Sequence, residues 1–387
     1  MTLEMMELYA TTTFGLEAVV RRELEQLGFR VLSTENGKVT FLSDVAGIAR
    51  ANLWLRTADR VLLKIAQFKA VTFDQLFDQT EALDWSRYIA KDGAFPVNGK
   101  SVKSTLFSIS DSQAIVKKAI AKSLTRAYGD AWLSESGSLH TVQVSLLNDI
   151  ATLTIDTSGT ALHKRGYRGN AVAAPLKETL AAAMIQLSYW NERRLLVDPF
   201  CGSGTIPIEA AMIARNIAPG LSRDFAFRHW HWIDEAVWKD ETKKAYQAMK
   251  PDLPLQIRAS DNDPLAILAA KANAEAAGVE DAIEFSEVAF EALRLSEDYG
   301  VLITNPPYGE RLSEIELLKP LYKTLSDRIA ALKTWSAYVI TSWPDFGAMG
   351  KRKADRERKL YNGNIETHNV QFMGPKPPLD ETTGTSR

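Results

Sequence analysis

Hydrophobic and polar residues in the first part of the chain follow the spacing of short strands and amphipathic helices. Residues 15–28 carry apolar side chains every three or four positions and end at Gly28, as in a helix closed by glycine. The pair Asn36-Gly37, between two apolar runs, predicts a hairpin. Strands are expected at 7–13, 29–32, 38–42 and 60–68, and a further helix at 44–55. This pattern predicts a small α+β unit.

A second α+β unit is expected from about residue 73 to residue 158. Its helices are predicted at 73–83 and 112–128, and its strands at 103–109, 141–147 and 150–156. Between Arg87 and Tyr128 eight basic residues stand against two acidic ones. This excess predicts contact with RNA phosphates, although a solvated helix face also explains the lysines of the second helix. The residues predicted to contact phosphates are Lys103, on the expected strand, and Lys117, Lys118 and Lys122, on the expected helix.

Beyond residue 176, long helical segments alternate with short apolar runs. These runs lie at 195–197, 256–259, 300–304 and 337–340. Strands separated by helices predict an α/β domain with a mostly parallel sheet. Near the end, Asn362-Gly363 separates two further apolar runs and predicts an antiparallel hairpin at one edge of that sheet.

Composition narrows the class of protein. With 387 residues, 45% of them hydrophobic and 24% charged, the chain has enough material for two or three globular domains. The single cysteine, Cys201, excludes an internal disulfide, and no zinc-ligand spacing occurs, so no metal is expected. The absence of signal-peptide and transmembrane patterns favours the cytoplasm. A net charge of -2 leaves room only for local basic patches as nucleic-acid contacts.

A glycine-rich turn follows the first apolar run of the α/β domain. The segment Asp198-Pro199-Phe200-Cys201-Gly202-Ser203-Gly204-Thr205 lies between a strand and a helix of small residues. Such a turn exposes backbone N–H groups and lets a ligand approach closely. The dinucleotide fingerprint and the P-loop are both absent, and Asp198 suits the amino group of S-adenosylmethionine. The alternative is a purely structural turn.

Acidic residues also end the next apolar run. Asp261 lies where doubly wound nucleotide-binding folds place the acid that binds ribose hydroxyls. Asp263 precedes Pro264, a position typical of a helix N-cap. We therefore expect Asp261, rather than Asp263, to bind ribose.

The chemistry is indicated by the segment Asn305-Pro306-Pro307-Tyr308, which follows the apolar run 300–304. The prolines lack N–H donors, so the backbone offers carbonyl acceptors. The side-chain oxygen of Asn305 and the Pro306 carbonyl can accept from a base NH2 group, and Tyr308 can stack on an extruded base. These residues predict transfer of a methyl group to an exocyclic amine.

Taken together, the segments Asp198–Thr205, Ser260–Pro264 and Asn305–Arg311 resemble class I methyltransferases that act on exocyclic amines. With the N-terminal α+β units and the connector DTSGTALHKRGYR, nearly the whole chain resembles THUMP-containing RNA methyltransferases. Within that family it is similar to the enzymes that methylate guanine N2 of bacterial 23S ribosomal RNA, in a short form with one methyltransferase domain. Ribosomal RNA is then the expected partner, ahead of tRNA, and no membrane partner is expected.

The resemblance also implies domain boundaries and roles for individual residues. The domains would be a ferredoxin-like unit at 1–55, a THUMP domain at 56–158, a linker at 159–175, a Rossmann-like methyltransferase domain at 176–375 and a disordered tail at 376–387. Glu287 would contact the cofactor adenine. The connector residues His163, Lys164, Arg165 and Arg168 would contact RNA or shape the cofactor pocket.

Two other functions fit parts of the sequence. A DNA adenine-N6 methyltransferase shares the Asn-Pro-Pro-Tyr motif, but no helix-turn-helix pattern is present. A non-catalytic RNA-binding module is opposed by the intact motif. Trp230 and Trp232 could stack on RNA, although packing in a core is preferred. The basic run 351–359 is expected to be a solvated loop, with a phosphate contact as the alternative.

Overall fold

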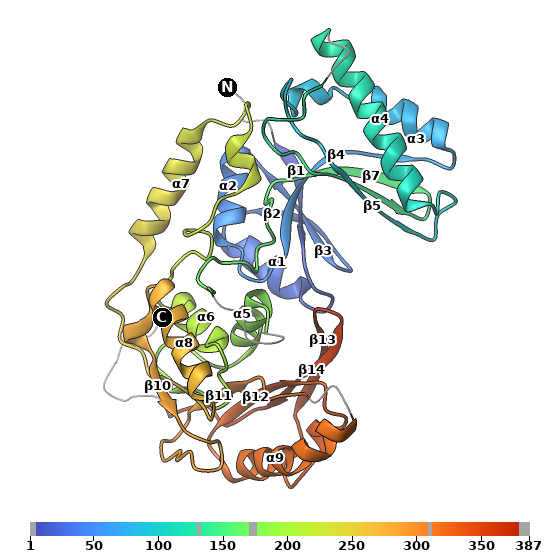
Figure 1. Ribbon diagram of the computed structural model, residues 1–387. Helices are drawn as coiled ribbons and strands as arrows, with labels where there is room; N and C mark the ends of the chain where they lie inside the picture. Colours follow the sequence, from blue (N-terminus) through green and yellow to red (C-terminus); the bar gives the residue numbers. More distant parts are fainter. Residues whose placement is uncertain (1–4, 130–132, 170–175, 309–311, 379–387) are drawn as a thin grey trace. The chain divides into compact units, whose positions relative to one another are not determined.

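The computed structural model describes residues 5–129, 133–169, 176–308 and 312–378, and it forms two compact units (Figure 1). Unit 1 contains the chain up to Arg165 together with Ala218–Ala248. Unit 2 contains Gly166–Ile217 and the chain from Met249 onward. Most of the predicted disordered tail lies outside the described residues, as do residues 170–175 of the predicted linker.

Unit 1 is built on one seven-stranded sheet, counted over the described residues, with the order β2-β3-β1-β4-β7-β6-β5. The sheet therefore runs without a break through both predicted α+β units. The pair β5–β6 is parallel, and the other neighbours are antiparallel. The strands are β1 (Met6–Thr11), β2 (Arg30–Glu35), β3 (Lys38–Ser43), β4 (Arg60–Lys69), β5 (Val97–Val102), β6 (Val142–Leu147) and β7 (Ile150–Asp156).

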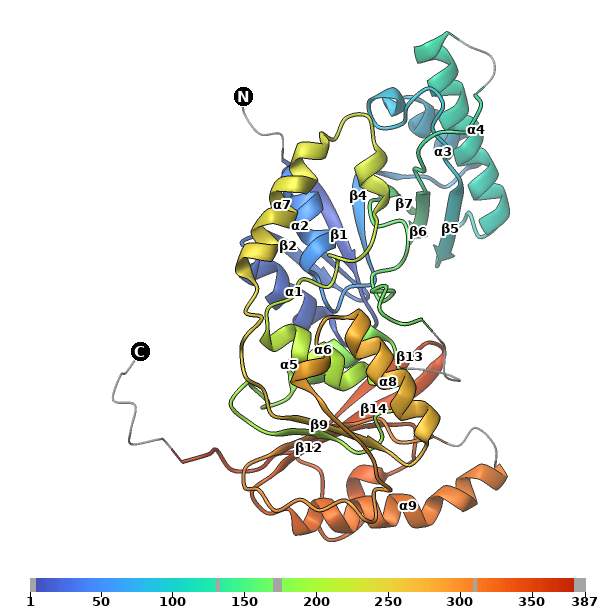
Figure 2. The ribbon, with the colours of Figure 1, turned by 60° about the vertical axis from the view of Figure 1, so that its left-hand side comes forward.

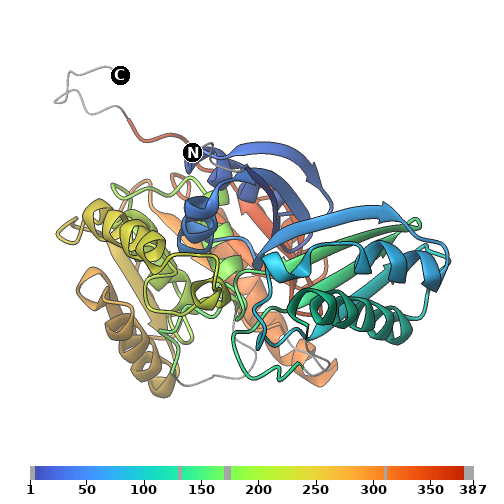
Figure 3. The same ribbon diagram turned by 90° about the horizontal axis from the view of Figure 1, so that it is seen from above.

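The helices of unit 1 begin at the polar caps that the sequence offers. Asp44, Thr72 and Ser108 each accept a hydrogen bond from a backbone N–H in the first turn of α2, α3 and α4. Helices α3 and α4 lie side by side, and α4 packs on β5 and β6 (Figure 3). The helices are α1 (Glu17–Gln26), α2 (Val45–Trp54), α3 (Phe73–Glu81), α4 (Ile109–Tyr128) and α7 (Glu235–Ala248), with short 3-10 turns η1 (Trp85–Arg87) and η2 (Ala226–His229).

One predicted strand of unit 1 is wrong. The strand expected at 103–109 lies earlier, at Val97–Val102. Lys103 adopts a left-handed φ of 48°, which ends the extended backbone, and Ser108 caps the helix that begins at Ile109. The alternation of apolar residues in 103–109 therefore belongs to a loop and a helix start.

The segment 218–248 supplies part of the core of unit 1, although it interrupts the chain of unit 2. Phe227 and Trp230 are buried in that core. The Trp230 indole N–H donates to the Leu139 carbonyl at 3.0 Å, and its ring stacks on His140 with centroids 5.1 Å apart. The preferred prediction of core packing is thus confirmed for Trp230, whose burial excludes stacking on RNA. Burial also lowers the pKa of His140 to about 4.

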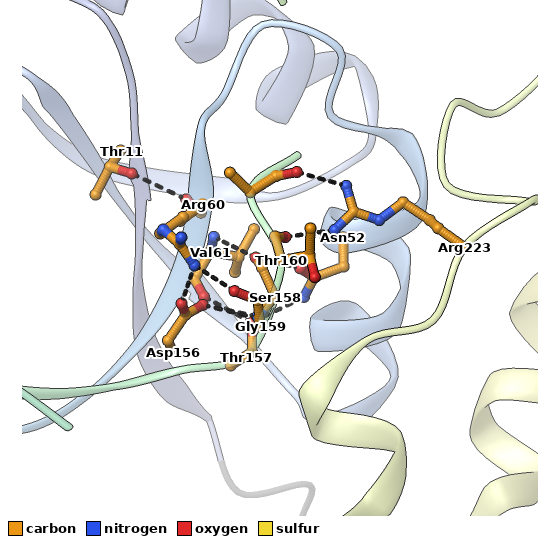
Figure 4. Close-up of polar contacts among 11 residues, drawn as sticks. Thr11, Asn52, Arg60, Val61, Asp156, Thr157, Ser158, Gly159, Thr160 and Arg223 are labelled. Atoms are coloured by element: carbon orange, nitrogen blue, oxygen red, sulfur yellow. Dashed lines mark hydrogen bonds and ion pairs between the residues drawn. The ribbon is translucent and has the colours of Figure 1, made fainter. Parts of the chain in front are cut away.

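Polar contacts from this segment, from β4 and from α2 hold the start of the connector (Figure 4). Arg223 donates to the carbonyls of Thr160 and Ala161, and Arg60 pairs with Asp156. The Ser158 hydroxyl donates to Asn52 at 2.6 Å, which ties the connector to α2. These contacts fix residues 156–161 within unit 1.

Unit 2 contains a second seven-stranded sheet, again over the described residues, with the order β10-β9-β8-β11-β12-β14-β13. Strands β8 to β12 are parallel, and β13–β14 is an antiparallel hairpin at the edge, as predicted. The strands are β8 (Leu196–Asp198), β9 (Ile257–Asp261), β10 (Glu284–Glu287), β11 (Val301–Thr304), β12 (Ser336–Thr341), β13 (Arg356–Asn362) and β14 (Ile365–Phe372).

Helices cover both faces of the sheet in unit 2. Helices α5, α6 and α8 lie on one face, and α9 lies on the other (Figure 2). Such a sheet buries both faces, which explains the continuous apolar runs in its strands. No helix in the described part of the chain is long and apolar enough to span a membrane. The helices are α5 (Glu178–Leu187), α6 (Thr205–Ala214), α8 (Pro264–Ala276) and α9 (Leu312–Ala331), with 3-10 turns η3 (Glu280–Ala282) and η4 (Phe346–Ala348).

Candidate active site

The residues of unit 2 that are predicted to bind the cofactor or the target base lie at the carboxyl ends of its parallel strands. Asp198 ends β8, Asp261 ends β9, Glu287 ends β10, and Asn305 follows β11 directly. Strand β8 lies between β9 and β11, so the strand order reverses beside it. Ligands of open α/β sheets bind at such a reversal, outside the carboxyl ends of the strands.

Asp198 is the most deeply buried acid of the site, with 1% of its surface exposed. Its Oδ1 accepts the Thr304 hydroxyl at 2.7 Å and the Phe200 N–H at 3.3 Å. Burial raises the pKa of the Asp198 carboxyl to about 7, although the hydrogen bond from Thr304 favours the ionised form. A cationic group beside this carboxylate would therefore be bound strongly. Sequence reasoning missed Thr304, whose place at the end of the strand beside β8 is the only available signal.

The glycine-rich turn has the backbone that the sequence predicts. Gly202 and Gly204 adopt φ values of 50° and 82°, which side chains rarely tolerate. A methyl group on Gly204 would lie 3.1 Å from the Ala270 Cβ, whereas one on Gly202 would meet nothing within 4 Å. Gly204 thus permits helix packing, and Gly202 leaves open space for a ligand. Pro199, Cys201, Ser203 and Thr205 are buried around the turn.

Asp261 links the ends of two strands. Its Oδ2 accepts the Gly202 N–H at 2.9 Å, and its Oδ1 accepts the Asp263 N–H at 3.1 Å. Asp263 caps α8 by accepting from the Leu265 N–H, as predicted. Glu287 is exposed and lies opposite Asp261 in the β9–β10 register. Asp263 is thus the helix cap, and Asp261 and Glu287 remain, with Asp198, as the acidic candidates for ligand binding.

The Asn-Pro-Pro-Tyr segment forms a compact loop after β11. The Tyr308 hydroxyl donates to Asn305 Oδ1 at 2.5 Å, and burial raises the pKa of Tyr308 well above its usual value. Within the described residues, the Pro306 carbonyl accepts no hydrogen bond from the protein. Asn305 Oδ1 thus already accepts one hydrogen bond, whereas the Pro306 carbonyl has no partner among the described residues. Gly309, Glu310 and Arg311 lie outside the described residues.

Three side chains from outside the sequence motifs support this loop. Tyr322 of α9 is fully buried, and its hydroxyl donates to the Pro307 carbonyl at 3.0 Å. The same hydroxyl lies 2.7 Å from Thr341 Oγ1 on β12, and burial raises the pKa of Tyr322 to about 12. Asn362 of β13 also acts on Tyr308, because its side chain lowers the pKa of the Tyr308 phenol against the effect of burial. No sequence signal distinguished these residues from ordinary core positions.

The connector residues occupy different environments. Arg168 donates to Thr205 Oγ1 at 2.7 Å and to the Leu176 carbonyl at 3.0 Å, so it supports the start of α6. Arg165 is 3% exposed and donates to the carbonyls of Leu162 and Arg56, so its guanidinium fixes the connector. Its contact with RNA or with the cofactor pocket stays a prediction. Lys164 is exposed and His163 is half-buried in unit 1.

The predicted RNA-binding lysines lie on the surface of unit 1. Lys117 pairs with Glu135 and Lys122 with Glu81, each at 2.9 Å. Lys118 lies over the Phe77 ring, 6.0 Å from its centroid. Lys103 is exposed in the loop after β5. Their contacts with RNA stay predictions.

Comparison with known proteins adds three family matches. The description "RMKL-like, methyltransferase domain" matches residues 165–371. The RlmL ferredoxin-like domain matches residues 7–62, and the THUMP domain matches residues 70–156. These matches cover both units of the structure.

Individual relatives agree with these matches. The chain is 47% identical to YpsC of Bacillus subtilis, named as an RNA methyltransferase, over 97% of this chain and 98% of that protein. It is 34% identical to the ribosomal RNA large subunit methyltransferase K/L of Syntrophotalea carbinolica, over 96% of this chain and 56% of that protein. The chain therefore spans about half the length of that relative.

Two solved structures share the whole fold. A Listeria monocytogenes protein, named by prediction an N6-adenine-specific DNA methylase, superposes with a TM-score of 0.91 at 47% identity, covering 96% of this chain and 97% of that one. SMU.472, a methyltransferase crystallised with S-adenosylhomocysteine (SAH), also gives 0.91, at 42% identity over 97% and 100% of the two chains. The chain belongs to the family of RMKL-like RNA methyltransferases, with RlmL ferredoxin-like and THUMP domains preceding the methyltransferase domain.

Proposed function

We propose that this protein methylates an exocyclic base amine of RNA, and that its target is the N2 amine of a guanine in 23S ribosomal RNA. The observation that carries the proposal is the position of Asn305 and the Pro306 carbonyl at the end of β11, beside the buried Asp198 of β8. This arrangement sets acceptors for an amine next to an acid suited to a cationic methyl donor.

S-adenosylmethionine is the methyl donor, and the site fits it. The open space at Gly202 admits a ligand against the backbone, and Asp198 can bind the amino group of its methionine part. Asp261 has further acceptor capacity for ribose hydroxyls beyond its two backbone bonds. When bound, the donor supplies an electrophilic methyl group on a sulfonium. SMU.472, the relative crystallised with SAH, shares this fold over 97% of this chain.

The residues of the Asn-Pro-Pro-Tyr loop then act on the target base. The lone pair of a base NH2 group is delocalised into the ring, so the amine is a weak nucleophile. Acceptance of its two hydrogens by Asn305 Oδ1 and the Pro306 carbonyl favours a pyramidal nitrogen and stabilises the developing positive charge. The nitrogen lone pair forms the bond to the methyl carbon as the carbon–sulfur bond breaks. The proton then leaves the acidic ammonium product for water, without a strong base.

Tyr308 has two roles in this proposal. Its ring offers a face for the extruded base, and its hydroxyl orients Asn305 through the 2.5 Å hydrogen bond. An amide oxygen has two lone pairs, so Asn305 Oδ1 can accept from the phenol and the amine together. The hydrogen bond between them therefore holds the acceptor without blocking it.

A DNA adenine-N6 methyltransferase is the second candidate, since the Listeria relative carries that name and the loop motif fits adenine as well. The THUMP match at residues 70–156 and the names of the Bacillus and Syntrophotalea relatives favour RNA. A non-catalytic RNA-binding module is the third, and the hydrogen-bonded Asn-Pro-Pro-Tyr loop opposes it.

Transfer of a labelled methyl group separates the three candidates. The purified protein is incubated with labelled donor and with 23S ribosomal RNA, tRNA or duplex DNA, and Asn305→Ala serves as the inactive control. We expect incorporation into ribosomal RNA by the wild type alone. Incorporation only into DNA would support the second candidate, and no incorporation into any substrate would support the third.

A further inference from the structure

The sheet of unit 1 is covered on one face only in its second half. Helix α4 packs on the side where Val142, Val144 and Leu146 of β6 are buried. The opposite side of β4, β7, β6 and β5 is here called the open face. Its exposed or half-exposed side chains include Gln67, Lys69, Asn98, Lys100, Gln143 and Ser145.

The strand register places these residues in rows across four strands. Lys100 lies opposite Ser145, Ser145 opposite Thr152, and Thr152 opposite Gln67. Residues in register share a face, so this row extends across three strand spacings, or about 14 Å. The next row runs from Lys69 through Ile150 and Leu147 to Val102, so it is apolar except for the lysine. The open face thus combines rows of polar and basic side chains with a largely apolar row at one end.

The lysines here form no ion pair with another described residue. No described carboxylate lies within ion-pair distance of Lys69, Lys100 or Lys103, although Asp149 interacts with Lys69 over a longer distance. In contrast, Lys117 and Lys122 on α4 pair with glutamates. Carboxylates of the protein therefore engage two of the three α4 lysines but none of these three.

The carboxylates that border the open face are already bonded. Glu7 pairs with Lys64 at 2.6 Å, and Asp156 pairs with Arg60. Asp149 accepts the Thr105 N–H at 2.6 Å, and this bond lowers the pKa of its carboxyl, so it stays ionised beside the backbone donor. Glu7 and Asp156 each have a cationic partner, which reduces their repulsion of an approaching polyanion, whereas Asp149 keeps its charge.

The loop between β5 and α4 also presents an aromatic side chain. The loop after β5 is held by the Ser101 hydroxyl, which donates to the Leu106 carbonyl at 2.7 Å, while Phe107 beside it is 83% exposed. An exposed aromatic ring on a fixed loop can stack on an unpaired base. Lysines, amide and hydroxyl donors, and an exposed ring together match the chemistry of RNA.

We infer that the open face of β4, β7, β6 and β5, rather than helix α4, is the surface of unit 1 that contacts the RNA backbone. Lys69, Lys100 and Lys103 bind phosphates, and the amides and hydroxyls between them bind phosphate or ribose oxygens. This inference rests on the proposed function, because it names the protein surface that holds the same RNA substrate.

Two matched triple variants test this inference. Lys69→Gln/Lys100→Gln/Lys103→Gln removes three charges from the open face, and Lys117→Gln/Lys118→Gln/Lys122→Gln removes three from α4. Affinity for transcribed 23S ribosomal RNA is measured from 50 to 300 mM salt. Each lost phosphate contact lowers the salt slope by about 0.7 on single strands, so the open-face variant should lose about two units. We expect its affinity at 150 mM salt to fall at least tenfold, and that of the α4 variant to stay within threefold.

The outcomes are distinguishable from failure of the proposed function. Thermal melting and cofactor binding of both variants should match the wild type, which shows that each is folded. A wild type that binds RNA, with an α4 variant weakened as much as the open-face variant or more, overturns this inference alone. An unchanged open-face variant, as expected for a surface that docks a protein, also overturns it. A wild type that neither binds nor methylates RNA overturns the proposed function as well.

A second set of variants tests the aromatic contact. Phe107→Tyr keeps a ring, whereas Phe107→Leu keeps apolar area without one. We expect wild-type RNA affinity for the tyrosine variant and a loss of about fivefold or more for the leucine variant. Equal affinities for the two would remove Phe107 from the RNA surface.

Discussion

The two sheets each contain seven strands in the part of the chain that the structure describes, but they offer chemistry in different places. In unit 2, helices cover both faces, and the polar residues gather at the strand ends, where Asp198 and Asn305 are tied to Thr304 and Tyr308. In unit 1, one face of the second half is open, and its polar residues are spread over four strands. The first arrangement suits a reaction at one atom, and the second suits many weak contacts with a long polyanion.

This difference predicts different responses to substitution. A buried hydrogen-bonded group contributes strongly at one point, because its loss leaves a partner unsatisfied. An exposed lysine contributes modestly, because water and salt screen its charge. Single substitutions at the strand-end site, formed by Asp198, Asn305 and their hydrogen-bond partners, should therefore reduce activity severely. Single substitutions on the open face should reduce RNA binding mildly, and their effects should add up.

The largest effect is expected for Asn305→Ala. Loss of one acceptor for the developing charge should lower kcat by about 100-fold or more, while cofactor affinity stays within a few-fold. Asn191→Ala, an exposed asparagine before β8, is the matched control and should keep wild-type turnover. Steady-state methylation of ribosomal RNA and calorimetric titration of the cofactor provide the two measurements. Unchanged turnover in Asn305→Ala would show that the chemistry lies elsewhere.

A smaller effect, on binding, is expected for Asp198→Asn. Replacement of a charged acceptor by a neutral one should weaken cofactor binding by about 10- to 100-fold, since a hydrogen bond to a charged group contributes about 1.5–3 kcal/mol. This variant tests the contribution of Asp198 to cofactor binding, separately from the chemistry at Asn305. Isothermal titration at pH 8 measures the loss, and equal affinity in both proteins would exclude an ionic contact at Asp198.

The same carboxyl predicts a pH dependence of cofactor binding. The pKa of Asp198 in the free protein is about 7, and a bound cation favours the ionised form and lowers that pKa. Affinity should therefore be fully present above pH 7 and should fall by up to tenfold per pH unit below it. In Asp198→Asn this slope should vanish. A slope that persists in the variant would assign the dependence to another group.

An intermediate effect is expected for Tyr322→Phe, which removes the hydroxyl that bonds the Pro307 carbonyl. Loss of one positioning hydrogen bond should lower kcat by about tenfold, with KM changed less, since about 1.4 kcal/mol is a factor of ten. Tyr338→Phe is the matched control, because this buried tyrosine of β12 accepts from the Tyr189 N–H and forms no hydrogen bond with the described residues of the loop. Equal turnover in the two variants would reduce Tyr322 to a packing role.

The smallest effect is expected for a single lysine of the open face. Lys100→Ala should weaken RNA binding by two- to fourfold at 150 mM salt and leave kcat unchanged. Lys118→Ala on α4 is the control and should have no measurable effect. Filter binding at several salt concentrations resolves a change of this size. A loss as large as that from Asn305→Ala would contradict the distributed character of this surface.

Sequence was sufficient where a local pattern determines a local structure. The turn after Asp198 and the loop at Asn305 each follow an apolar strand, so the parallel sheet had to bring them to one edge. The register of the sheet, in contrast, depends on contacts between distant residues. The open face could not be predicted because its rows join residues 67, 152, 145 and 100.

Two other features lay beyond local pattern. The segment 218–248 reads as part of the methyltransferase domain, but the burial of Phe227 and Trp230 in the core of unit 1 appears only in three dimensions. Tyr322 lies on a helix with ordinary apolar spacing, and only its hydroxyl contact with Pro307 distinguishes it. Long-range packing, rather than propensity, sets both positions.

The identity of the methylated nucleoside tests the central claim most directly. Ribosomal RNA treated with the protein and a donor carrying a deuterated methyl group is digested to nucleosides and analysed by mass spectrometry. The account predicts the label on N2-methylguanosine, with none in the Asn305→Ala reaction. Label on a ring carbon or a ribose oxygen would contradict it, because neither atom is an amine held by Asn305 and the Pro306 carbonyl.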